Sequence, residues 1–577
     1  MILRRAALLA CLLILASSAG LGDDALMGRY GPQQMGFTSE KLEPPLILTW
    51  EYTANRFHGN TAAPVAANGM CYFASGDRVY GLDMETGNLI WKYPMEQSLT
   101  STVKATPAIV DGRLYFGTGD GKLYCLDAAT GAFQWFFETR AALRCPPLIL
   151  DDIMYIGSDD DSIYTIHADT GDTAWPKPFQ SRDGFANGIA VGAGMVVGSC
   201  MDGNLYGVNA SSGKLRWMFR LPSVPVKTSP IMTENLTIMA LGNVIYGLTT
   251  RSGQRKWMIQ LPSEVSATPA TDGTDVFVTC HNKKLYCYNV AGRQPALRWA
   301  ESADIGGIPL SSPIVADQLV YVTGSHGVVV AFSVADGTLK WRYVFAPSAI
   351  TTPGSSFTDA STSPIVANGA LLVLTEDGVL HCFTKTAPDT SPPDFYFLTP
   401  ANGARMSGAP PIKFSAALYD IGSGVDFSSA TMMLDSEPVE LAKDLSTGIV
   451  SYVTDIGDPK ISVVKPLKDG VHIVTLVAND YAGNRLVKEW SFTADSSMPP
   501  PRRVQTEVGK STKEPGSVSR SGRNTGGSSG SGNVSPPPPP PPPGPGGNSG
   551  SNDGGYGRSR GRGHNRDQSN DQQPPRQ

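Results

Sequence analysis

Eight of the nine tryptophans in this chain of 577 residues recur at nearly constant spacing. The steps between them are 41, 44, 40, 42, 40, 42 and 42 residues. A fixed period of about 40 residues indicates one supersecondary unit that is repeated, and such units are stable only when each packs against its neighbours. The sequence therefore predicts an all-β propeller fold. The eight residues are Trp50, Trp91, Trp135, Trp175, Trp217, Trp257, Trp299 and Trp341.

The repeated unit contains four strands. Its second half is clearest in GDRVYGLDMETGNLIW (76–91), where a strand, a Gly-centred turn and a strand ending in Trp follow one another. Gly supplies the positive φ that such a reversal requires. The first half lies upstream, as in SSPIVADQLVYVTGSHG (311–327). Eight upstream halves predict eight blades.

The last repeat lacks a Trp strand of its own. It ends at residues 378–384, whereas residues 46–52 form an unpaired Trp strand one period before Trp91. We therefore predict that this N-terminal strand completes the eighth blade and closes the ring, which leaves only short, protected strand edges.

The D-x-x-T-G-x-x-x-W core of the repeat resembles the tryptophan-docking motif of the PQQ-like (pyrroloquinoline quinone repeat, BamB-like) β-propellers. The resemblance covers about residues 42–386. It implies that all eight tryptophans are structural and pack between adjacent blades. It does not by itself transfer an activity, because one fold carries many functions.

The N-terminus predicts export. Residues 1–22 combine two arginines, an apolar run and small residues suited to cleavage, which is typical of a signal peptide. Removing it leaves seven cysteines, with no CxxC pair, and we interpret them as small buried residues. The expected location is the periplasm, the cell surface or the medium.

The regions after the propeller change in composition. Residues 387–394 read as a Pro-rich linker, and residues 395–495 resemble a bacterial immunoglobulin-like β-sandwich, with short alternating strands and Gly, Asp and Asn turns. Residues 496–577 contain almost no apolar side chains and eight consecutive prolines, which predicts a disordered Pro/Gly/Ser/Arg-rich tail.

Four residues of the sandwich are candidate calcium ligands. Asp420 and Asp426 lie on the segment YDIGSGVD, and Asp480 and Asn484 lie on DYAGN. Calcium takes six to eight oxygen ligands, which such side chains supply. Asx residues also stabilise turns without a metal, and we favour that second interpretation.

Two classes of function compete on this fold. A quinoprotein dehydrogenase holds PQQ and calcium in the propeller funnel, but the resemblance there includes a vicinal cysteine pair and long insertions between blades, and this chain has neither. A compact BamB-like propeller binds partner proteins without a cofactor, and the uniform repeat favours it.

The sequence thus predicts an exported, non-catalytic binding scaffold of the bacterial envelope or surface, acting as a monomer on protein partners and without a cofactor. The alternative is a PQQ- and calcium-dependent dehydrogenase that oxidises alcohols or sugars. Outside its basic tail the chain carries a net charge of −11, which argues against nucleic-acid binding. After signal removal no transmembrane span is expected.

Overall fold

The computed structural model describes residues 24–54, 62–185, 188–222, 228–345, 358–386, 388–454 and 466–500. The predicted signal peptide (1–22) and all but the first five residues of the predicted tail (496–577) lie outside the described residues. Among the residues described, no helix has the length and apolar character needed to cross a bilayer.

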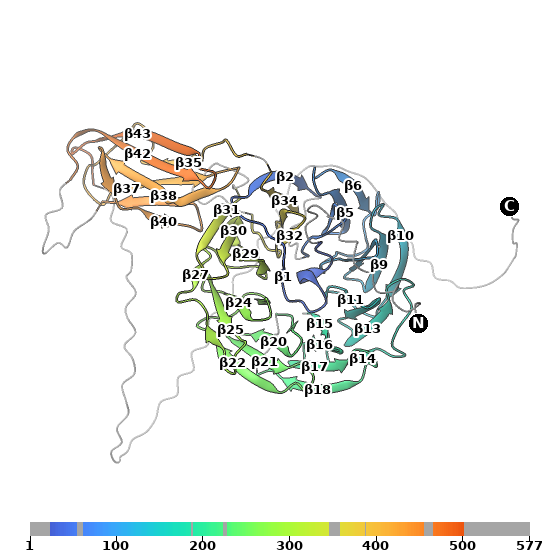
Figure 1. Cartoon of the computed structure of the whole chain (residues 1–577). Helices are drawn as coiled ribbons and strands as arrows, with labels where there is room; N and C mark the ends of the chain where they lie inside the picture. Colours follow the sequence, from blue (N-terminus) through green and yellow to red (C-terminus); the bar gives the residue numbers. More distant parts are fainter. Residues whose placement is uncertain are drawn as a thin grey trace, which may run out of the picture. The chain divides into compact units, whose positions relative to one another are not determined.

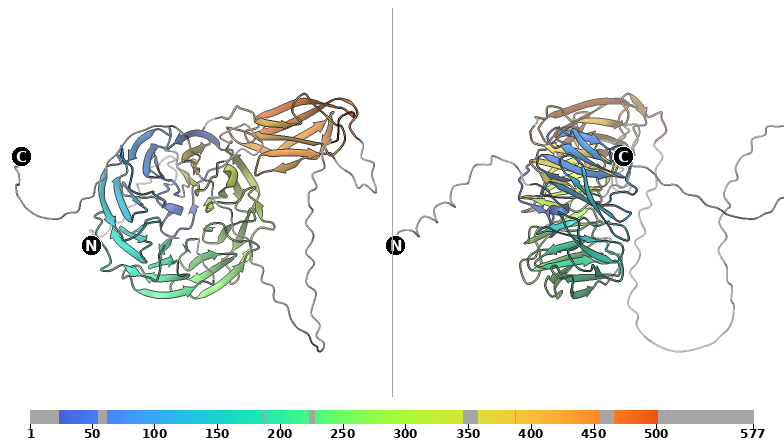
Figure 2. Two further views of the ribbon diagram at one scale, coloured as in Figure 1. Left: turned by 180° about the vertical axis from the view of Figure 1, so that it is seen from behind. Right: turned by 90° about the vertical axis from the view of Figure 1, so that its right-hand side faces the viewer.

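The described residues between 24 and 384 form a β-propeller, as the repeat predicts. Eight antiparallel sheets are arranged around a central channel (Figure 1), and Figure 2 shows the ring from behind and edge-on. In each sheet the strands lie side by side, with the first strand of the repeat nearest the channel and the last at the perimeter. The first four sheets contain β3 (Val65–Ala67), β4 (Met70–Ser75), β5 (Arg78–Asp83) and β6 (Leu89–Tyr93); β7 (Ala108–Val110), β8 (Arg113–Gly117), β9 (Lys122–Asp127) and β10 (Phe133–Glu138); β11 (Leu148–Leu150), β12 (Ile153–Gly157), β13 (Ser162–His167) and β14 (Phe179–Gln180); and β15 (Ile189–Gly192), β16 (Met195–Ser199), β17 (Asn204–Asn209) and β18 (Leu215–Arg220).

The remaining four sheets complete the ring. They contain β19 (Ile231–Met232), β20 (Leu236–Leu241), β21 (Val244–Thr249) and β22 (Arg255–Gln260); β23 (Ala270–Thr271), β24 (Asp275–Cys280), β25 (Lys284–Asn289), β26 (Ala296–Leu297) and β27 (Ala303–Asp304); β28 (Ile314–Ala316), β29 (Leu319–Gly324), β30 (Val328–Ser333) and β31 (Leu339–Val344), with the short 3₁₀ turn η2 (Ser325–Gly327); and β32 (Ile365–Ala367), β33 (Ala370–Leu374), β34 (Val379–Thr384) and β2 (Ile47–Thr53).

The ring is closed by the N-terminal strand. β2 pairs antiparallel with β34, with Ile47 opposite Thr384 and Thr53 opposite Val379. The sheet therefore joins residues more than 300 positions apart, and neither end of the propeller repeat is left with an open strand edge.

The conserved spacing of the repeat has a direct physical cause. The indole N–H of Trp50 donates to the carbonyl of Met84 in the next blade, at 3.1 Å. Gly87 adopts φ +71°, and a Cβ there would lie 2.6 Å from the Trp50 ring. Asp83 holds the turn, since its Oδ1 accepts from both the amide and the hydroxyl of Thr86. Each D-x-x-T-G turn thus seats the tryptophan of the preceding blade. The same indole contact joins Trp91 to Ala128, Trp175 to Ala210, Trp217 to Thr250 and Trp299 to Val334.

Where a tryptophan of the repeat lies in a strand, the residue opposite it is small. Trp91 lies opposite Gly81, Trp135 opposite Cys125 and Trp50 opposite Cys382, and a β-bulge precedes the tryptophan in each case. A bulge re-aims the side chain that follows it. All seven cysteines of the described residues are buried and unpaired.

An inner segment, residues 24–40, runs along the wall of the channel and contacts every sheet of the ring (Figure 1). It contains the short turn η1 (Gly28–Tyr30) and β1 (Phe37–Thr38), which pairs in parallel with β28. Its contacts follow the order of the sheets: Ala25 with Ala66, Leu26 with Ile109, Met27 with Ile149, Pro32 with Val191, Gln33 with Met232, Met35 with Thr271, Gly36 with Val315, and Tyr30 and Glu40 with residues 366–369. The predicted propeller, 42–386, did not include this segment.

The described residues of the range 394–494 (394–454 and 466–494) form two further sheets around a core of their own, which includes Phe414, Trp490 and Phe492. We call this region the C-terminal sandwich. One sheet contains β35 (Asp394–Thr399), β37 (Lys413–Tyr419), β41 (Ile449–Val453) and β40 (Ala442–Asp444). The other contains β36 (Ala404–Met406), β43 (Arg485–Ala494), β42 (Gly470–Asp480), β38 (Val425–Leu434) and β39 (Glu437–Val439).

Candidate functional site

The central channel contains a cavity of about 430 Å³. Its floor comes from the inner segment, and its walls come from the residues that lead into the innermost strands of the sheets. Many of these are hydroxyl residues that tie neighbouring blades together: Thr106 Oγ1 accepts from the amide of Ala63, and Thr268 Oγ1 accepts from the amide of Ser229. The cavity is therefore lined by residues that also form the contacts between neighbouring blades.

Three cationic side chains line this cavity, and the described lining contains no carboxylate. The three are Arg29, Lys104 and Arg144. Arg29 donates to the carbonyls of Gln34 and Pro269, and no carboxylate of the described residues lies within salt-bridge distance of it. Burial without a counter-ion lowers the pKa of Arg29 to about 9. The cavity is thus an electropositive pocket.

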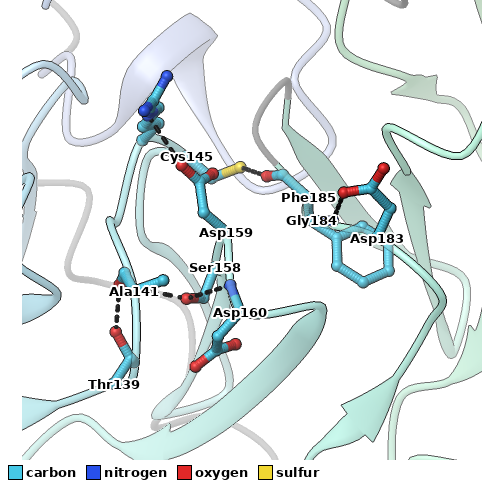
Figure 3. Close-up of polar contacts among 10 residues, drawn as sticks. Thr139, Ala141, Cys145, Ser158, Asp159, Asp160, Asp183, Gly184 and Phe185 are labelled. Atoms are coloured by element: carbon cyan, nitrogen blue, oxygen red, sulfur yellow. Dashed lines mark hydrogen bonds and ion pairs between the residues drawn. The ribbon is translucent and has the colours of Figure 1, made fainter.

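A carboxylate that contacts the lining belongs to Asp159, in the loop between β12 and β13. Its Oδ2 lies 2.9 Å from Nε of Arg144, while its Oδ1 is buried and without a hydrogen-bond partner. Figure 3 shows this loop beside Cys145, whose thiol donates to the carbonyl of Phe185. The sequence contains three consecutive aspartates here, Asp159 to Asp161, but the repeat gives no sign that only the first faces the cavity rim.

The environment of Asp159 keeps its proton affinity high. Burial raises the pKa of Asp159 above its usual range, Arg144 opposes this effect, and the charges of Asp160 and Asp183 add to it. A carboxyl group with a raised pKa at the edge of a pocket is suited to accept a proton.

A second cluster of polar groups lies in the C-terminal sandwich. The carboxylates of Asp389, Asp420 and Asp480 converge, with their oxygen atoms within 4.8 Å of one another. Two of the predicted calcium candidates, Asp420 and Asp480, therefore meet, and Asp389 of the predicted linker joins them. Burial, opposed by the amide of Gly424 and reinforced by the charges of Asp389 and Asp480, raises the pKa of Asp420 to about 6.

The other two calcium candidates have different places. Asn484 turns its amide nitrogen toward the cluster and donates to Oδ2 of Asp480 at 2.8 Å and to the carbonyl of Asp389 at 3.0 Å. Asp426 lies outside the cluster, since its Oδ1 accepts from the amide and hydroxyl of Ser428. Asp389 was not identified from the sequence, because nothing in the Pro-rich linker marks one aspartate as different from its neighbours.

The fold and the repeated docking contacts define a class of protein, the PQQ-like β-propellers. Within that class the family assignment is direct. The family model described as outer membrane protein assembly factor BamB matches residues 48–135, 75–181, 177–294 and 241–391, which together span more than half of the chain. The protein belongs to this family.

The curated relatives point to a second group within the same class. Over 98 residues the chain is 34% identical to the dehydrogenase subunit of an alcohol dehydrogenase (quinone) from Gluconobacter oxydans, a match that covers 16% of this chain and 13% of the relative. Over 121 residues it is 32% identical to the quinohemoprotein alcohol dehydrogenase ADH-IIG from Pseudomonas putida, covering 20% of this chain and 17% of that protein. The chain therefore matches less than a fifth of the length of either relative.

Among solved structures, BamB from Moraxella catarrhalis is similar over 60% of this chain and 99% of its own, with 18% sequence identity and a TM-score of 0.46.

Two sequence-based expectations are contradicted by these comparisons. The chain was expected not to be an enzyme and to use no cofactor, because it lacks a vicinal cysteine pair and long insertions between blades. Its curated relatives are nevertheless named as quinone and quinohemoprotein alcohol dehydrogenases. Both expectations are therefore wrong, since they rested on missing features, whereas this chain shares a stretch of about 100 residues with these dehydrogenases.

Proposed function

We propose that the propeller is a quinone-dependent dehydrogenase domain that binds an anionic quinone of the PQQ type in its central cavity and oxidises an alcohol. The observation that carries the proposal is the lining of the cavity, which is cationic and contains no carboxylate among the described residues. The relatives named as alcohol dehydrogenases favour this chemistry over other uses of an anion pocket.

The residues present fit such a cofactor. PQQ is a planar polycarboxylate, and Arg29 and Lys104 would each pair with a carboxylate, while Arg144 holds Asp159. A volume of about 430 Å³ lies within the range of small-molecule sites. The described lining does not fit the calcium ion of the alternative hypothesis, since it offers that ion no carboxylate, and we derive no step through a metal in this cavity.

A bound quinone would supply the electron acceptor for the carbon that is oxidised. The chain's own contribution is to position the cofactor and to handle the proton. Arg29, at the floor, is fixed by backbone carbonyls and would orient one carboxylate. Asp159, held by Arg144 at the rim, is the candidate acceptor for the hydroxyl proton of the alcohol.

We further propose that the domain works outside the cytoplasm with a protein partner. The family description refers to the outer membrane, and residues 1–22 read as an export signal. The perimeter strands expose apolar side chains, among them Ile90 at 53%, Phe136 at 52% and Met218 at 57%, which a partner could cover.

The test is a titration of the signal-free protein with PQQ, followed by tryptophan fluorescence and calorimetry, and then a dye-linked assay with primary alcohols. We expect saturable binding of one equivalent and alcohol-dependent dye reduction. Lys104→Gln and Arg29→Gln should each weaken binding by about tenfold, the effect of one charge-assisted contact of about 1.4 kcal/mol.

The matched control is Arg251→Gln, which removes an exposed arginine from a turn on the perimeter and should leave binding unchanged. Lys104 is exposed, so we expect Lys104→Gln to fold. This variant therefore still tests the proposal if Arg29→Gln fails to fold. An absence of PQQ binding by the wild-type protein would overturn the proposal.

A further inference from the structure

We propose that Asp389, Asp420 and Asp480 form a calcium site that fastens the linker after the propeller to the C-terminal sandwich. This site is separate from the quinone cavity and does not depend on the function proposed above. It is a metal site assembled from three distant segments: the linker, the residue that follows β37 and the last residue of β42.

The first argument is the geometry of the oxygen atoms. All three carboxylates offer an atom within 4.8 Å of the others. A calcium ion binds oxygen at about 2.3–2.6 Å, so two ligands on opposite sides of it lie about 5 Å apart, and oxygen atoms within this limit can share one ion. A set made only of carboxylate oxygens selects a hard cation.

The second argument is an unpartnered buried atom. Asp420 is only 5% exposed, and its two oxygens differ: Oδ2 accepts from the amides of Gly422 and Gly424, while Oδ1 is buried with no hydrogen-bond partner. A buried carboxylate oxygen without a partner is costly, and it is retained where something else satisfies it. A cation held by the three carboxylates would do so.

The third argument is charge balance. Asp480 is 3% exposed, and no lysine, arginine or histidine of the described residues forms a salt bridge with any of the three aspartates. Arg342 lines the same small cavity as Asp420, and its Nη1 donates to the carbonyl of Ile305, but within the described part of the chain it forms no salt bridge with Asp420, and its Nε and Nη2 have no hydrogen-bond partner. Amide donors fix the carboxylates in place without neutralising them, as the amide of Ser423 does for Asp389 at 2.8 Å. Three converging negative charges therefore lack a counter-ion.

The site would act on the contact between the linker, the sandwich and the ring. Residues 421–424 follow Asp420 directly, and the carbonyl of Ser423 accepts from the indole N–H of Trp341 at 2.7 Å. In other blades the equivalent indole N–H donates to a carbonyl of the next blade. The carbonyl of Gly422 accepts from the amide of Leu48 in β2. A cation on Asp389 and Asp420 would hold this loop in the conformation that seats Trp341.

The experiment uses the full signal-free chain, stripped of metal and free of quinone, so that its outcome is independent of the dehydrogenase proposal. Calcium is titrated by calorimetry and the melting temperature is followed with calcium and with EDTA. We expect one saturable calcium site per chain and a rise in melting temperature that EDTA reverses. Asp420→Asn and Asp480→Asn should each weaken calcium binding by about 10- to 100-fold.

The matched control is Asp426→Asn, since Asp426 lies on the same segment but caps Ser428. It should bind calcium as the wild type does. Asp389→Asn provides a variant outside the sandwich core should Asp420→Asn not fold, and it should lose binding as well. Absence of a saturable calcium signal in the wild type, binding by Asp389→Asn and Asp480→Asn as tight as that of the wild type, or preference for magnesium over calcium would each overturn the proposal.

Discussion

The ring and the inner segment of this protein are held together in opposite ways. In the ring, one set of contacts recurs from blade to blade: a tryptophan, a glycine turn that seats it and a small residue opposite. Along the inner segment, each contact with a sheet is made by a different residue. The repeat builds the frame and supplies two of the three cations of the cavity lining, whereas the inner segment, which lies outside the repeat, adds Arg29 and contacts that each occur once.

The largest effect should come from the ring. Trp217 is 8% exposed, packs on Gly253 and donates to the carbonyl of Thr250. Replacing it with alanine opens a cavity between two blades, and we expect Trp217→Ala to reduce the free energy of unfolding by about 3–5 kcal/mol. Chemical denaturation measures this. Leu215→Ala, at a half-exposed position of the same strand, should change it by about 0.5 kcal/mol or less. Equal effects of the two would contradict the docking role.

A substitution at Gly253, the glycine that seats Trp217, should combine backbone strain with a steric clash, and a second glycine allows the two to be measured separately. Gly253 adopts φ +67°, and a Cβ there would lie 2.5 Å from the Trp217 ring; Gly112 adopts φ +71° with no atom within 4 Å. Gly112→Ala should cost about 1–2 kcal/mol from backbone strain alone. Gly253→Ala should cost about 1–3 kcal/mol more, because the ring must move. Similar melting temperatures for the two variants would show that the turn does not need space for the tryptophan.

A single substitution in the inner segment should reduce the free energy of unfolding by less than the loss of a docking tryptophan does. Glu40 is 7% exposed, and its carboxylate accepts from the amides of Asn368 and Gly369 in the eighth sheet. Glu40→Gln leaves one amide poorly satisfied, and we expect a loss of about 1–3 kcal/mol. Glu43→Gln, an exposed change three residues later, is the control. Hydrogen exchange of the amides of residues 368–369 should rise in the first variant only, and unchanged protection would show that the segment is not fastened there.

The smallest effect is a pH dependence in the C-terminal sandwich. Nδ1 of His472 lies 2.6 Å from Oδ2 of Asp435, and Nε2 lies 2.8 Å from the carbonyl of Lys468. Burial lowers the pKa of His472, but these hydrogen bonds outweigh it and hold the pKa above its ordinary value of 6.5. The pKa of Asp435 is lowered, so its carboxylate stays ionised over the same range.

Because the folded-state pKa of His472 exceeds the unfolded value, the pair contributes fully below pH 6.5 and loses its contribution as pH rises through the raised pKa. We expect a decline of about 1 kcal/mol or less. Calorimetric melting from pH 5.5 to 8.5 should show this decline in the wild type and a flatter profile in His472→Gln. A steeper profile in the variant would contradict this assignment.

The same contrast explains what the sequence could and could not predict. The tryptophan ladder predicts the propeller and its closure by residues 46–52, because a period is visible without any structure. The inner segment has no period, so nothing in GRYGPQQMG announces that Arg29 would lie in the channel. Asp426 was included among the calcium candidates because it is near Asp420 in sequence, whereas Asp389 is near it only in space.

The closure of the ring also determines how late during synthesis the eighth sheet can be completed. β2 leaves the ribosome before the other blade strands, yet its partner β34 ends the propeller more than 300 residues later. Until then β2 has no partner strand, and the growing ring keeps an unpaired strand edge exposed. At about 5–20 residues per second this delay lasts tens of seconds, so the nascent chain needs shielding over the whole interval.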